Sequence, residues 1–473
     1  MQVTAPDLSP YLREGFAPVA DEIVAADLPV VGEIPRDLDG LMVRNGPNPR
    51  FEPRGHYHWF DGDGMLHAVR IRDGRVTYRN RWVRTEGLAA EEAAGRSLWS
   101  GIMESTRDNP KGAPYKDTAN TDVVFHRDSL VATWYICGRP YRVDARTLAT
   151  LGPDDFGAGQ PLRISAHAKV DPATGELFFF DYGLRPPFLR YGVVDATGQL
   201  AHLVPVELPG PRLPHDMAIT ERFAILMDLP VTFTPEALVQ RRWSVGFFPE
   251  MPSRFAIIPR RGDPHQVRWF EASPCYIYHV VNAWEEGDEV VLVACRVADP
   301  LPPIDPADGM WARMMANLRI TAQLYRWRFN LVTGATREEL IDDRNSEFPS
   351  IASPWRARRS RWSYNVTFAK VPTVRFDGLV KYDTDTGASS GYSFGPGRYG
   401  SESPFAPRAG ATAEDDGYLL SFVHDEREQV SELVILHAQH LAGGPIARVR
   451  LPQRIPAGFH ATWVDGAQLP AGA

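Results

Sequence analysis

Alternating apolar and polar residues dominate the chain after residue 40 and predict short, half-buried β-strands. The pattern is clearest over Leu66–Val83, where Val69 and Ile71 alternate with arginines up to the pair Asp73-Gly74 and the alternation resumes beyond it. Because Asp-Gly is a strong signal of a two-residue turn, this segment is predicted to be a β-hairpin.

Comparable hairpin patterns recur along the chain, each with an Asp or Asn followed by a glycine. They lie at Asp144–Gly152, Asp171–Gly175, Asp195–Gly198, Asn330–Gly334 and Asp383–Gly387. Asp and Asn side chains form local turns and glycine adopts positive φ, so each site predicts a turn between strands. Repeated hairpins without a regular strand–helix alternation indicate an all-β fold built by radial repetition, a β-propeller. No long Pro-, Gly- or Ser-rich linker divides residues 1–473, which are expected to form one domain.

Helices are expected mainly as insertions, after an irregular N-terminal arm. The arm covers residues 1–40, with one helical turn near residues 19–26. Thr234 followed by Pro235 is typical of a helix start. The Ala- and Glu-rich segment 87–99 predicts a second helix.

A third helix is predicted over residues 308–320, and it has an apolar face. That face is formed by Met310, Trp311, Met314, Met315 and Leu318. Methionine-rich faces adapt to varied shapes. The helix therefore either packs on the propeller, or forms the lip of an apolar substrate tunnel or a shallow membrane contact.

Composition narrows the function classes. The chain is 44% apolar and 23% charged, which suits a globular protein with a large core. Its net charge of −8 disfavours nucleic acid as the main partner. No apolar run reaches the ~18 residues of a transmembrane helix, and the N-terminus lacks the pattern of a secretion signal. Three cysteines without C-x-x-C spacing, Cys137, Cys275 and Cys295, fit a reducing compartment, so a cytoplasmic protein is expected.

One histidine lies in the middle of a predicted buried strand. The segment Ile277–Val281 is apolar, with β-branched and aromatic residues, and His279 is at its centre. A buried imidazole without a partner costs about 1–3 kcal/mol, so His279 needs either a hydrogen bond or a metal ion. The strand alone leaves both interpretations open.

The chain has thirteen histidines, which fall into three groups. Six lie beside turn or charged residues and are assigned to the surface: His126, His202, His265, His424, His437 and His440. His56, His58 and His67 form a local group in a turn-rich stretch and are weaker metal candidates. The remaining four begin or centre apolar segments: His167, His215, His279 and His460. Inner strands of a propeller point into one channel, so the four residues can meet there. Spacing alone leaves two interpretations open, hydrogen-bonded core histidines or a metal site, for which iron, zinc, copper and nickel all suit imidazole.

Several motifs follow one another along the chain. They are Arg44–Pro49 (RNGPNP), His58–His67 (HWFDGDGMLH), Arg79–Thr85 (RNRWVRT), Ala166–Glu176 (AHAKVDPATGE) and Tyr278–Ala283 (YHVVNA). In combination they resemble the carotenoid cleavage oxygenase family, from about residue 10 to the C-terminus. The resemblance implies a seven-bladed β-propeller with a helical cap over an axial metal site. It implies that non-haem Fe(II) is held by His167, His215, His279 and His460.

The resemblance also implies partners for the ligand histidines, whose second ring nitrogen is usually held by a carboxylate. Glu347 is expected to face His279, and Glu402 to face His460. A third glutamate is expected before the Gly-x-Pro-Tyr turn, but this chain has Ile136 there. His215 is therefore expected to be held by water or by a backbone carbonyl.

The reaction implied is oxidative cleavage of a C=C bond by O₂ to two carbonyl products. Four neutral imidazoles leave iron its +2 charge and two adjacent open positions, and no protein acid or base is then required. Thr121 matches a residue whose methyl group narrows one open position, and Phe60 matches an aromatic residue near the iron. Ile136 and Leu301 are also assigned to the substrate pocket.

Two substrate classes compete. Relatives that cleave stilbenes grip a phenol with a tyrosine and a lysine, and Ile102 and Tyr135 occupy those places here. The missing phenol clamp favours an apolar tunnel for a long polyene, such as an apocarotenal, over a stilbene or phenylpropenoid. A different class stays open as well, a propeller that is a Ca²⁺-dependent hydrolase or a binding scaffold.

Overall fold

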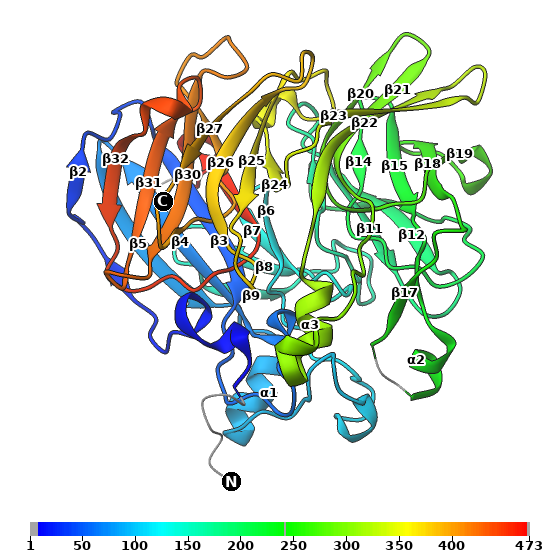
Figure 1. The fold of residues 1–473 in the computed structure, drawn as a ribbon, viewed down its shortest axis with the longest axis horizontal. Helices are drawn as coiled ribbons and strands as arrows, with labels where there is room; N and C mark the ends of the chain where they lie inside the picture. The colour runs from blue at the N-terminus through cyan, green and yellow to red at the C-terminus, as the bar shows by residue number, and fades with distance from the viewer. Residues whose placement is uncertain (1–7, 241–242, 471–473) are drawn as a thin grey trace.

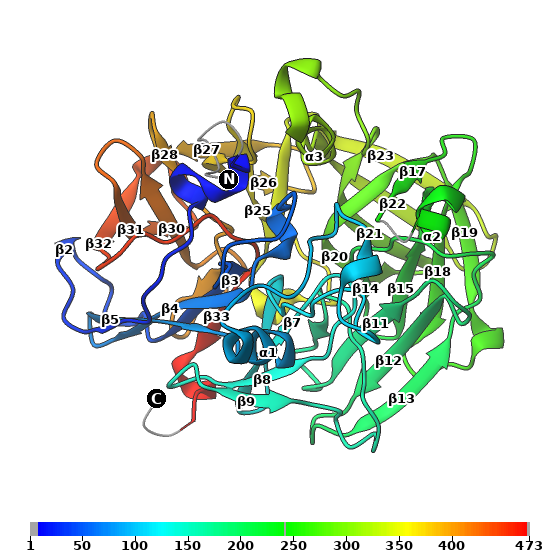
Figure 2. The same ribbon diagram turned by 90° about the horizontal axis from the view of Figure 1, so that it is seen from below.

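Seven antiparallel sheets surround a central axis in the computed structural model, which describes residues 8–240 and 243–470 (Figures 1 and 2). Each sheet has four to six strands, and β16 (Val231–Phe233) and β17 (Val245–Phe247) form a separate hairpin. The fold is a seven-bladed β-propeller, which confirms the predicted fold class. No helix within the described ranges is both long and apolar enough to cross a lipid bilayer.

The first four blades, each given from the inner strand outward, take up most of the first half of the chain. Blade 1 contains β33 (Ala461–Asp465), β3 (Gly40–Pro47), β4 (Gly64–Arg72), β5 (Arg75–Trp82) and β1 (Val24–Ala25). Blade 2 contains β6 (Asp122–His126), β7 (Ser129–Thr133), β8 (Tyr141–Asp144) and β9 (Thr150–Pro153). Blade 3 contains β10 (Lys169–Val170), β11 (Leu177–Tyr182), β12 (Leu189–Val194) and β13 (Leu200–Pro205). Blade 4 contains β14 (Ala218–Ile219), β15 (Phe223–Asp228), β18 (Ser253–Pro259) and β19 (Arg268–Ala272).

The last three blades complete the ring. Blade 5 contains β20 (Tyr276–Glu286), β21 (Glu289–Val297), β22 (Ala322–Asn330) and β23 (Thr336–Asp342). Blade 6 contains β24 (Ser346–Ser350), β25 (Trp362–Phe368), β26 (Phe376–Asp383) and β27 (Ser389–Ser393). Blade 7 contains the short inner strands β28 (Arg398–Tyr399) and β29 (Phe405–Pro407), then β30 (Gly417–Asp425), β31 (Val430–His437), β32 (Pro445–Arg450) and β2 (Val30–Gly32).

The ring is closed by strands from opposite regions of the chain. β33 pairs with β3 in blade 1, with Gly40 opposite Asp465. The N-terminal arm adds the outer strands β1, on blade 1, and β2, on blade 7. Blade 1 is therefore closed at its inner edge by the C-terminal strand β33, and the N-terminal arm supplies the outer strand of both blade 1 and blade 7.

The predicted hairpin turns are confirmed. Asp73 and Gly74 join β4 to β5 with φ values of 51° and 74°, the double positive φ of a type I′ turn. The later turns use the same chemistry: Asp195 Oδ1 accepts the Thr197 N–H at 2.8 Å, and Gly198 has a φ of 84°. Turns of this kind can be predicted from the sequence because they depend only on neighbouring residues.

Three short helices lie on one side of the propeller and form its cap (Figure 1). They are α1 (Glu86–Ala94), α2 (Pro235–Gln240) and α3 (Ala312–Asn317). Short 3₁₀ turns cover Pro10–Leu12, Glu14–Phe16, Trp59–Asp61, Thr106–Asp108, Pro264–Gln266, Pro306–Trp311, Ser353–Trp355, Leu441–Gly443 and Gly466–Gln468. α1 begins at its cap residue Thr85 and ends at Gly95, which has a φ of 65°, shorter than the predicted range.

Two helical predictions need correction. Residues 19–26 contain no helical turn, because β1 pairs with β5 there and the Asn80 side chain bonds both the Ile23 N–H and the Asp21 carbonyl. The continuous helix predicted over 308–320 is instead a 3₁₀ turn followed by α3. The interruption is at Gly309, whose φ of 58° and ψ of −133° are not helical.

The apolar face of that segment packs inward, apart from one methionine. Trp311, Met314, Met315 and Leu318 are buried, whereas Met310 is 58% exposed. Packing against the protein therefore accounts for most of the apolar face. The shallow membrane contact and the cytoplasmic location stay predictions.

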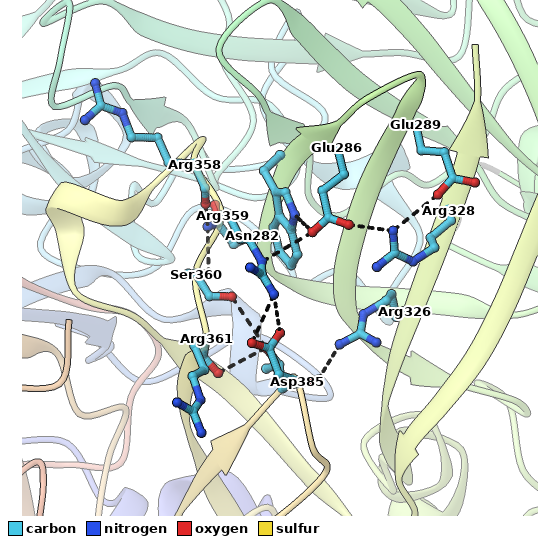
Figure 3. A network of polar contacts seen from close by, with 12 residues as sticks. Asn282, Glu286, Glu289, Arg326, Arg328, Arg358, Arg359, Ser360, Arg361 and Asp385 are labelled. Atoms are coloured by element: carbon cyan, nitrogen blue, oxygen red, sulfur yellow. Dashed lines mark hydrogen bonds and ion pairs between the residues drawn. The ribbon is translucent and has the colours of Figure 1, made fainter. Parts of the chain in front are cut away.

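A polar network links blades 5 and 6 through the loop of residues 355–361 (Figure 3). Asn282 of β20 holds this loop: its amide nitrogen donates to the carbonyls of Trp355 and Arg358 and to Ser360 Oγ. Its amide oxygen accepts the Ala357 N–H at 3.0 Å. One buried side chain thus satisfies four polar groups of a loop that makes no strand pairing.

Ion pairs on the outside of the same network also connect blades 5 and 6. Arg359 lies 3.3 Å from Glu286 and 3.1 Å from Asp385, which joins a blade 5 strand to the turn after β26 (Figure 3). Arg328 bonds both Glu286 and Glu289. The Arg359 pairs are exposed and the Arg328 pairs are half-buried, so water screens them and they contribute less than the buried amide.

Replacing Asn282 by Ala is expected to lower the free energy of unfolding by about 2–3 kcal/mol, since it leaves buried loop groups unpaired. The matched control is Arg359→Ala, which removes only exposed ion pairs and should change stability by less than about 1 kcal/mol. Urea denaturation followed by tryptophan fluorescence measures both. Equal losses for the two variants would contradict this account of the loop.

Candidate metal centre

The four dispersed histidines all lie at the cap-side ends of inner strands. His167, His215 and His460 come just before β10, β14 and β33, and His279 is the fourth residue of β20. The inner strands of neighbouring blades pack against one another around the axis. Residues from blades 1, 3, 4 and 5 therefore reach one point.

The imidazole rings form a compact group. The His167 ring centroid lies 4.5 Å from that of His460, 4.8 Å from His215 and 5.0 Å from His279. His279 is 4.7 Å from His460 and 5.2 Å from His215. Ring nitrogens of His167, His279 and His460 all lie within 4.8 Å of one another, while His215 is outside that tighter set.

Two glutamates hold two of the rings from behind. Glu347 Oε2 of β24 lies 2.5 Å from His279 Nδ1, and Glu402 Oε1 lies 3.3 Å from His460 Nδ1. These contacts leave the Nε2 atom of each ring directed away from its glutamate. The same arrangement orients histidine ligands in metal sites generally.

His215 has no such support. Its Nδ1 atom is buried and has no hydrogen-bond partner among the residues that the structure describes. The expected backbone carbonyl is not within bonding distance in that set. Ile136, at the position where a glutamate is expected, lies in the apolar core beside Trp134 and Cys137.

Burial sets the protonation of the cluster. It holds the pKa of His167, His215 and His279 well below the ordinary value, and the neighbouring imidazoles lower these values further. Burial also lowers the pKa of His460, but Glu402 outweighs it and the pKa lies above the ordinary value. Burial raises the pKa of Glu347 to about 8. Three rings are therefore neutral and keep a lone pair for a ligand bond.

The residues fit a metal ion with nitrogen ligands. His167 Nε2 and His279 Nε2 are buried and lack a hydrogen-bond partner within residues 8–240 and 243–470. Orphaned buried nitrogens are costly unless a ligand or ion satisfies them. Neutral imidazoles suit iron, zinc, copper and nickel, whereas Ca²⁺ prefers oxygen ligands.

Two further carboxylates position the ligand strands, and sequence reasoning missed them. Asp122 Oδ2 accepts the His167 N–H at 3.0 Å, and Asp216 Oδ2 accepts the Val280 N–H at 2.8 Å. His167 has a φ of 68°, which non-glycine residues rarely adopt, so its backbone needs such a restraint. Asp216 directly follows His215 in the sequence, and this adjacency was the available signal.

An apolar cavity of ≈ 270 Å³ lies between the cap and the histidines. His215, His279 and His460 form its inner end, and Ile304, Arg313 and Leu318 line the side toward the cap. Phe348, Phe459, Tyr276, Tyr278, Trp243 and Met103 also line it and were not predicted. Phe459 and Tyr278 directly precede His460 and His279, a place that strand alternation assigns to the opposite face, so only their closeness to the histidines in the sequence could have pointed to them.

Most predicted pocket residues lie on this cavity. Phe60, Ile102, Tyr135 and Leu301 all line it, and the Phe60 ring is 5.2 Å from that of Tyr135. Ile136 does not line it and is a core residue, whereas its neighbour Tyr135 lines the cavity with its ring 5.2 Å from that of His215.

Thr121 lies on the same cavity with its hydroxyl group occupied. Thr121 Oγ1 donates to Asn120 Oδ1 at 2.9 Å and accepts the Tyr135 N–H at 3.2 Å. The methyl group is the part of the side chain that is left to face the cavity. This placement suits the predicted role of narrowing one side of the site.

Four histidines differ from their predicted settings, and one of them is His67, which is 1% exposed within β4. His126 and His424, assigned to the surface, are 3% and 6% exposed, and His126 Nε2 contacts the Gly175 carbonyl at 3.0 Å. His58 is buried and lines the apolar cavity, but its Nδ1 accepts the Phe60 N–H. The polar residues beside these histidines in the sequence suggested a surface position, but they do not show that a strand packs against the next blade.

Comparisons with known proteins agree with this geometry. Residues 16–465 match the family model described as retinal pigment epithelial membrane protein (RPE65). The carotenoid 9,10(9',10')-cleavage dioxygenase 1 of Arabidopsis thaliana is 38% identical over 97% of this chain and 90% of its own length. The crystal structure of Pseudomonas brassicacearum lignostilbene dioxygenase has a TM-score of 0.88 and 29% identity, covering 97% of this chain and 99% of its own. A cobalt-substituted Synechocystis apocarotenoid oxygenase has a TM-score of 0.84 and 31% identity, covering 96% and 98%.

Replacing Glu347 by Gln is expected to weaken metal binding about 10- to 100-fold, because the amide is a poorer acceptor for the His279 N–H. The control Glu271→Gln changes an exposed glutamate of β19 and should leave the affinity as it is. Competition with a chelator of known affinity measures both. Wild-type affinity in Glu347→Gln would refute the positioning role.

Replacing Ile136 by Glu is expected to give His215 the carboxylate partner that it lacks and to raise metal retention about tenfold. The control Ile136→Met keeps the core apolar. Metal content after dialysis and the turnover rate are compared for the two variants. Unchanged content and rate in Ile136→Glu would show that the missing partner is unimportant.

Proposed function

Because this chain belongs to the RPE65/carotenoid cleavage oxygenase family, we propose that it cleaves a C=C bond of an apocarotenoid with O₂, using Fe(II) bound by His167, His215, His279 and His460. The chain is an alkene-cleaving dioxygenase, and its products are two carbonyl compounds. The proposal adds the metal, its four ligands and the substrate class.

One observation carries the proposal: the apolar cavity ends on the histidine cluster. Its inner end is formed by three of the four rings, and its walls are mainly aromatic and aliphatic. A polyene in this cavity would have one part of its chain beside the metal, away from bulk water. Binding would draw on apolar contact area and on few directional bonds.

Fe(II), when bound, would supply the activation of O₂ toward an electron-rich alkene. The protein groups around the iron hold its ligand rings in place and limit the space on the cavity side. Glu347 and Glu402 fix the rings of His279 and His460, and the Thr121 methyl group limits space on the cavity side. Phe60 and Phe459, whose ring centroids are 5.0 Å apart, exclude water from the wall nearest His460.

No protein acid or base is needed on the cavity. Burial lowers the pKa of His58 to about 3, so this ring stays neutral. Burial raises the pKa of Tyr278, so the tyrosine remains protonated. Arg313 is the one Asp, Glu, Lys or Arg residue on the wall, counted over the described chain. The cavity therefore orients a substrate without exchanging protons with it.

The wall at Ile102 and Tyr135 favours a polyene over a stilbene. A phenol-binding site needs charged or strongly donating groups, and Ile102 supplies neither. Tyr135 offers a single hydroxyl group, and burial raises its pKa well above the ordinary value. An uncharged apocarotenoid therefore suits this wall better than a phenolic substrate.

Stilbene cleavage is the second candidate, since the Pseudomonas brassicacearum lignostilbene dioxygenase shares the fold at a TM-score of 0.88. Fold similarity alone does not identify the substrate. A Ca²⁺-dependent hydrolase is less well supported, because the buried group offers nitrogen ligands where calcium prefers oxygen.

Product analysis with a panel of apocarotenals and hydroxystilbenes tests the substrate class. After anaerobic iron loading, the wild type is expected to cleave an apocarotenal and to leave the hydroxystilbenes largely intact. The double variant Ile102→Tyr, Tyr135→Lys should shift the ratio of kcat/KM values toward hydroxystilbene by about tenfold or more, because it builds a phenol clamp. Ile102→Val is the control that keeps the wall apolar. Faster cleavage of hydroxystilbene by the wild type would reverse the assignment.

A further inference from the structure

A second cavity reaches the histidine cluster from the side opposite the cap. Its volume is ≈ 220 Å³, and its lining extends from the exposed residues Pro172 and Gln468 to His167, His279 and His460. The inner strands β6, β10, β14, β20, β24 and β33 form its walls. We call this cavity the axial channel.

The axial channel is lined by charged groups, unlike the apolar cavity. The carboxylates are those of Asp122, Asp216 and Glu402, and the cations are Lys169 and Arg356. Lys169 Nζ pairs with Asp216 Oδ1 at 2.6 Å. The unpartnered, buried Nε2 atoms of His167 and His279 belong to residues on the wall of the same channel.

Arg356 is the cation that lies among the remaining carboxylates. Its Nη1 atom donates to the Val170 carbonyl at 3.1 Å, at the end of β10. Burial lowers its pKa, whereas Asp122, Asp216, Asp171 and Glu402 all act to raise it. A side chain from the blade 6 loop thus reaches across the channel and balances negative charge contributed by several blades.

The loop that carries Arg356 is fixed on both sides of it. Asn282 bonds the carbonyl of Trp355 and the N–H of Ala357, the two neighbours of Arg356. Ala357 has a φ of 65°, a strained backbone that aids the sharp turn. Backbone anchoring on either side leaves the long Arg356 side chain able to change rotamer while its loop stays in place.

We propose that the axial channel is the route by which the metal ion reaches the histidines, and that the Arg356 side chain is a movable plug that closes it. The inference rests on the proposed metal site. When Arg356 swings out, Asp122 and Glu402 lose their counter-charge and attract a divalent cation. When it returns, the channel is blocked again on the solvent side of the metal.

The two cavities differ in what they admit. Moving a divalent ion through the apolar cavity would strip its water without replacing it, which is strongly unfavourable. The axial channel offers carboxylate oxygens along the way, and acid-lined clefts raise the local concentration of cations. Substrate and metal ion would therefore use opposite sides of the same site.

Arg356→Ala is the decisive variant, and apo protein with Co²⁺ as a spectroscopic probe gives a readout without turnover. Stopped-flow absorbance of the cobalt bands measures uptake, and a chelator added to the loaded protein measures loss. Both rates are expected to rise about tenfold or more in Arg356→Ala. Arg358→Ala, on the same loop but paired with Glu221 on the outside, is the matched control and should behave as wild type.

The directions in which the uptake rate and the loss rate change distinguish a plug from a charge that acts at a distance. If Arg356 acts only by repelling the cobalt ion, its removal would speed uptake and slow loss. That result would overturn the proposal that Arg356 is a plug. Arg356→Gln keeps most of the bulk without the charge and should give rates between those of wild type and Arg356→Ala. Rates equal to wild type in both variants would also overturn it.

Two further results distinguish other failures. Leu301→Trp obstructs the apolar cavity and should leave cobalt uptake unchanged. Slower uptake in this variant would assign the route to the apolar cavity. If no variant, nor the wild type, develops cobalt bands, the proposed metal site itself fails, a result that is separate from unchanged rates in a protein that binds cobalt.

Discussion

The centre of this propeller depends on carboxylates that reach from one blade to the backbone of the next. Asp122 of blade 2 accepts the His167 N–H, Asp216 of blade 4 accepts the Val280 N–H, and Glu402 of blade 7 accepts the Ala461 N–H at 2.5 Å. Each bond enters a strand that carries a histidine. Inner strands near the axis cannot all be satisfied by their own sheet, and these bonds supply the missing acceptors.

His215 is the exception to this pattern. Neither its ring nor its strand receives a carboxylate from the preceding blade in the described parts of the chain, and its Nδ1 atom has no partner there. Aromatic rings surround it instead, with Tyr135 and Tyr278 at 5.2 and 5.1 Å. The ring is thus held by packing, which restrains orientation less strictly than a charged hydrogen bond.

The sequence was informative where the signal is local or the chemistry is unusual. Asp73-Gly74 identifies its turn, and His279 in an apolar strand identifies a buried imidazole. It was less informative where contacts from outside the segment decide. His126 is buried by packing from outside its own strand, and Val24 and Ala25 pair with β5 inside a segment whose local preference is helical. Glu347 and Glu402 came from family motifs, because no spacing rule connects them to their histidines.

Ring closure has a consequence for how the site is assembled. His460 immediately precedes β33, the strand that pairs with β3 and joins regions far apart in the chain. Such distant pairing forms slowly, because a long loop must close before any contact compensates for the lost entropy. The histidine cluster thus reports on ring closure: a chain with an open ring lacks one of its imidazoles, so metal affinity itself distinguishes closed propellers from open ones.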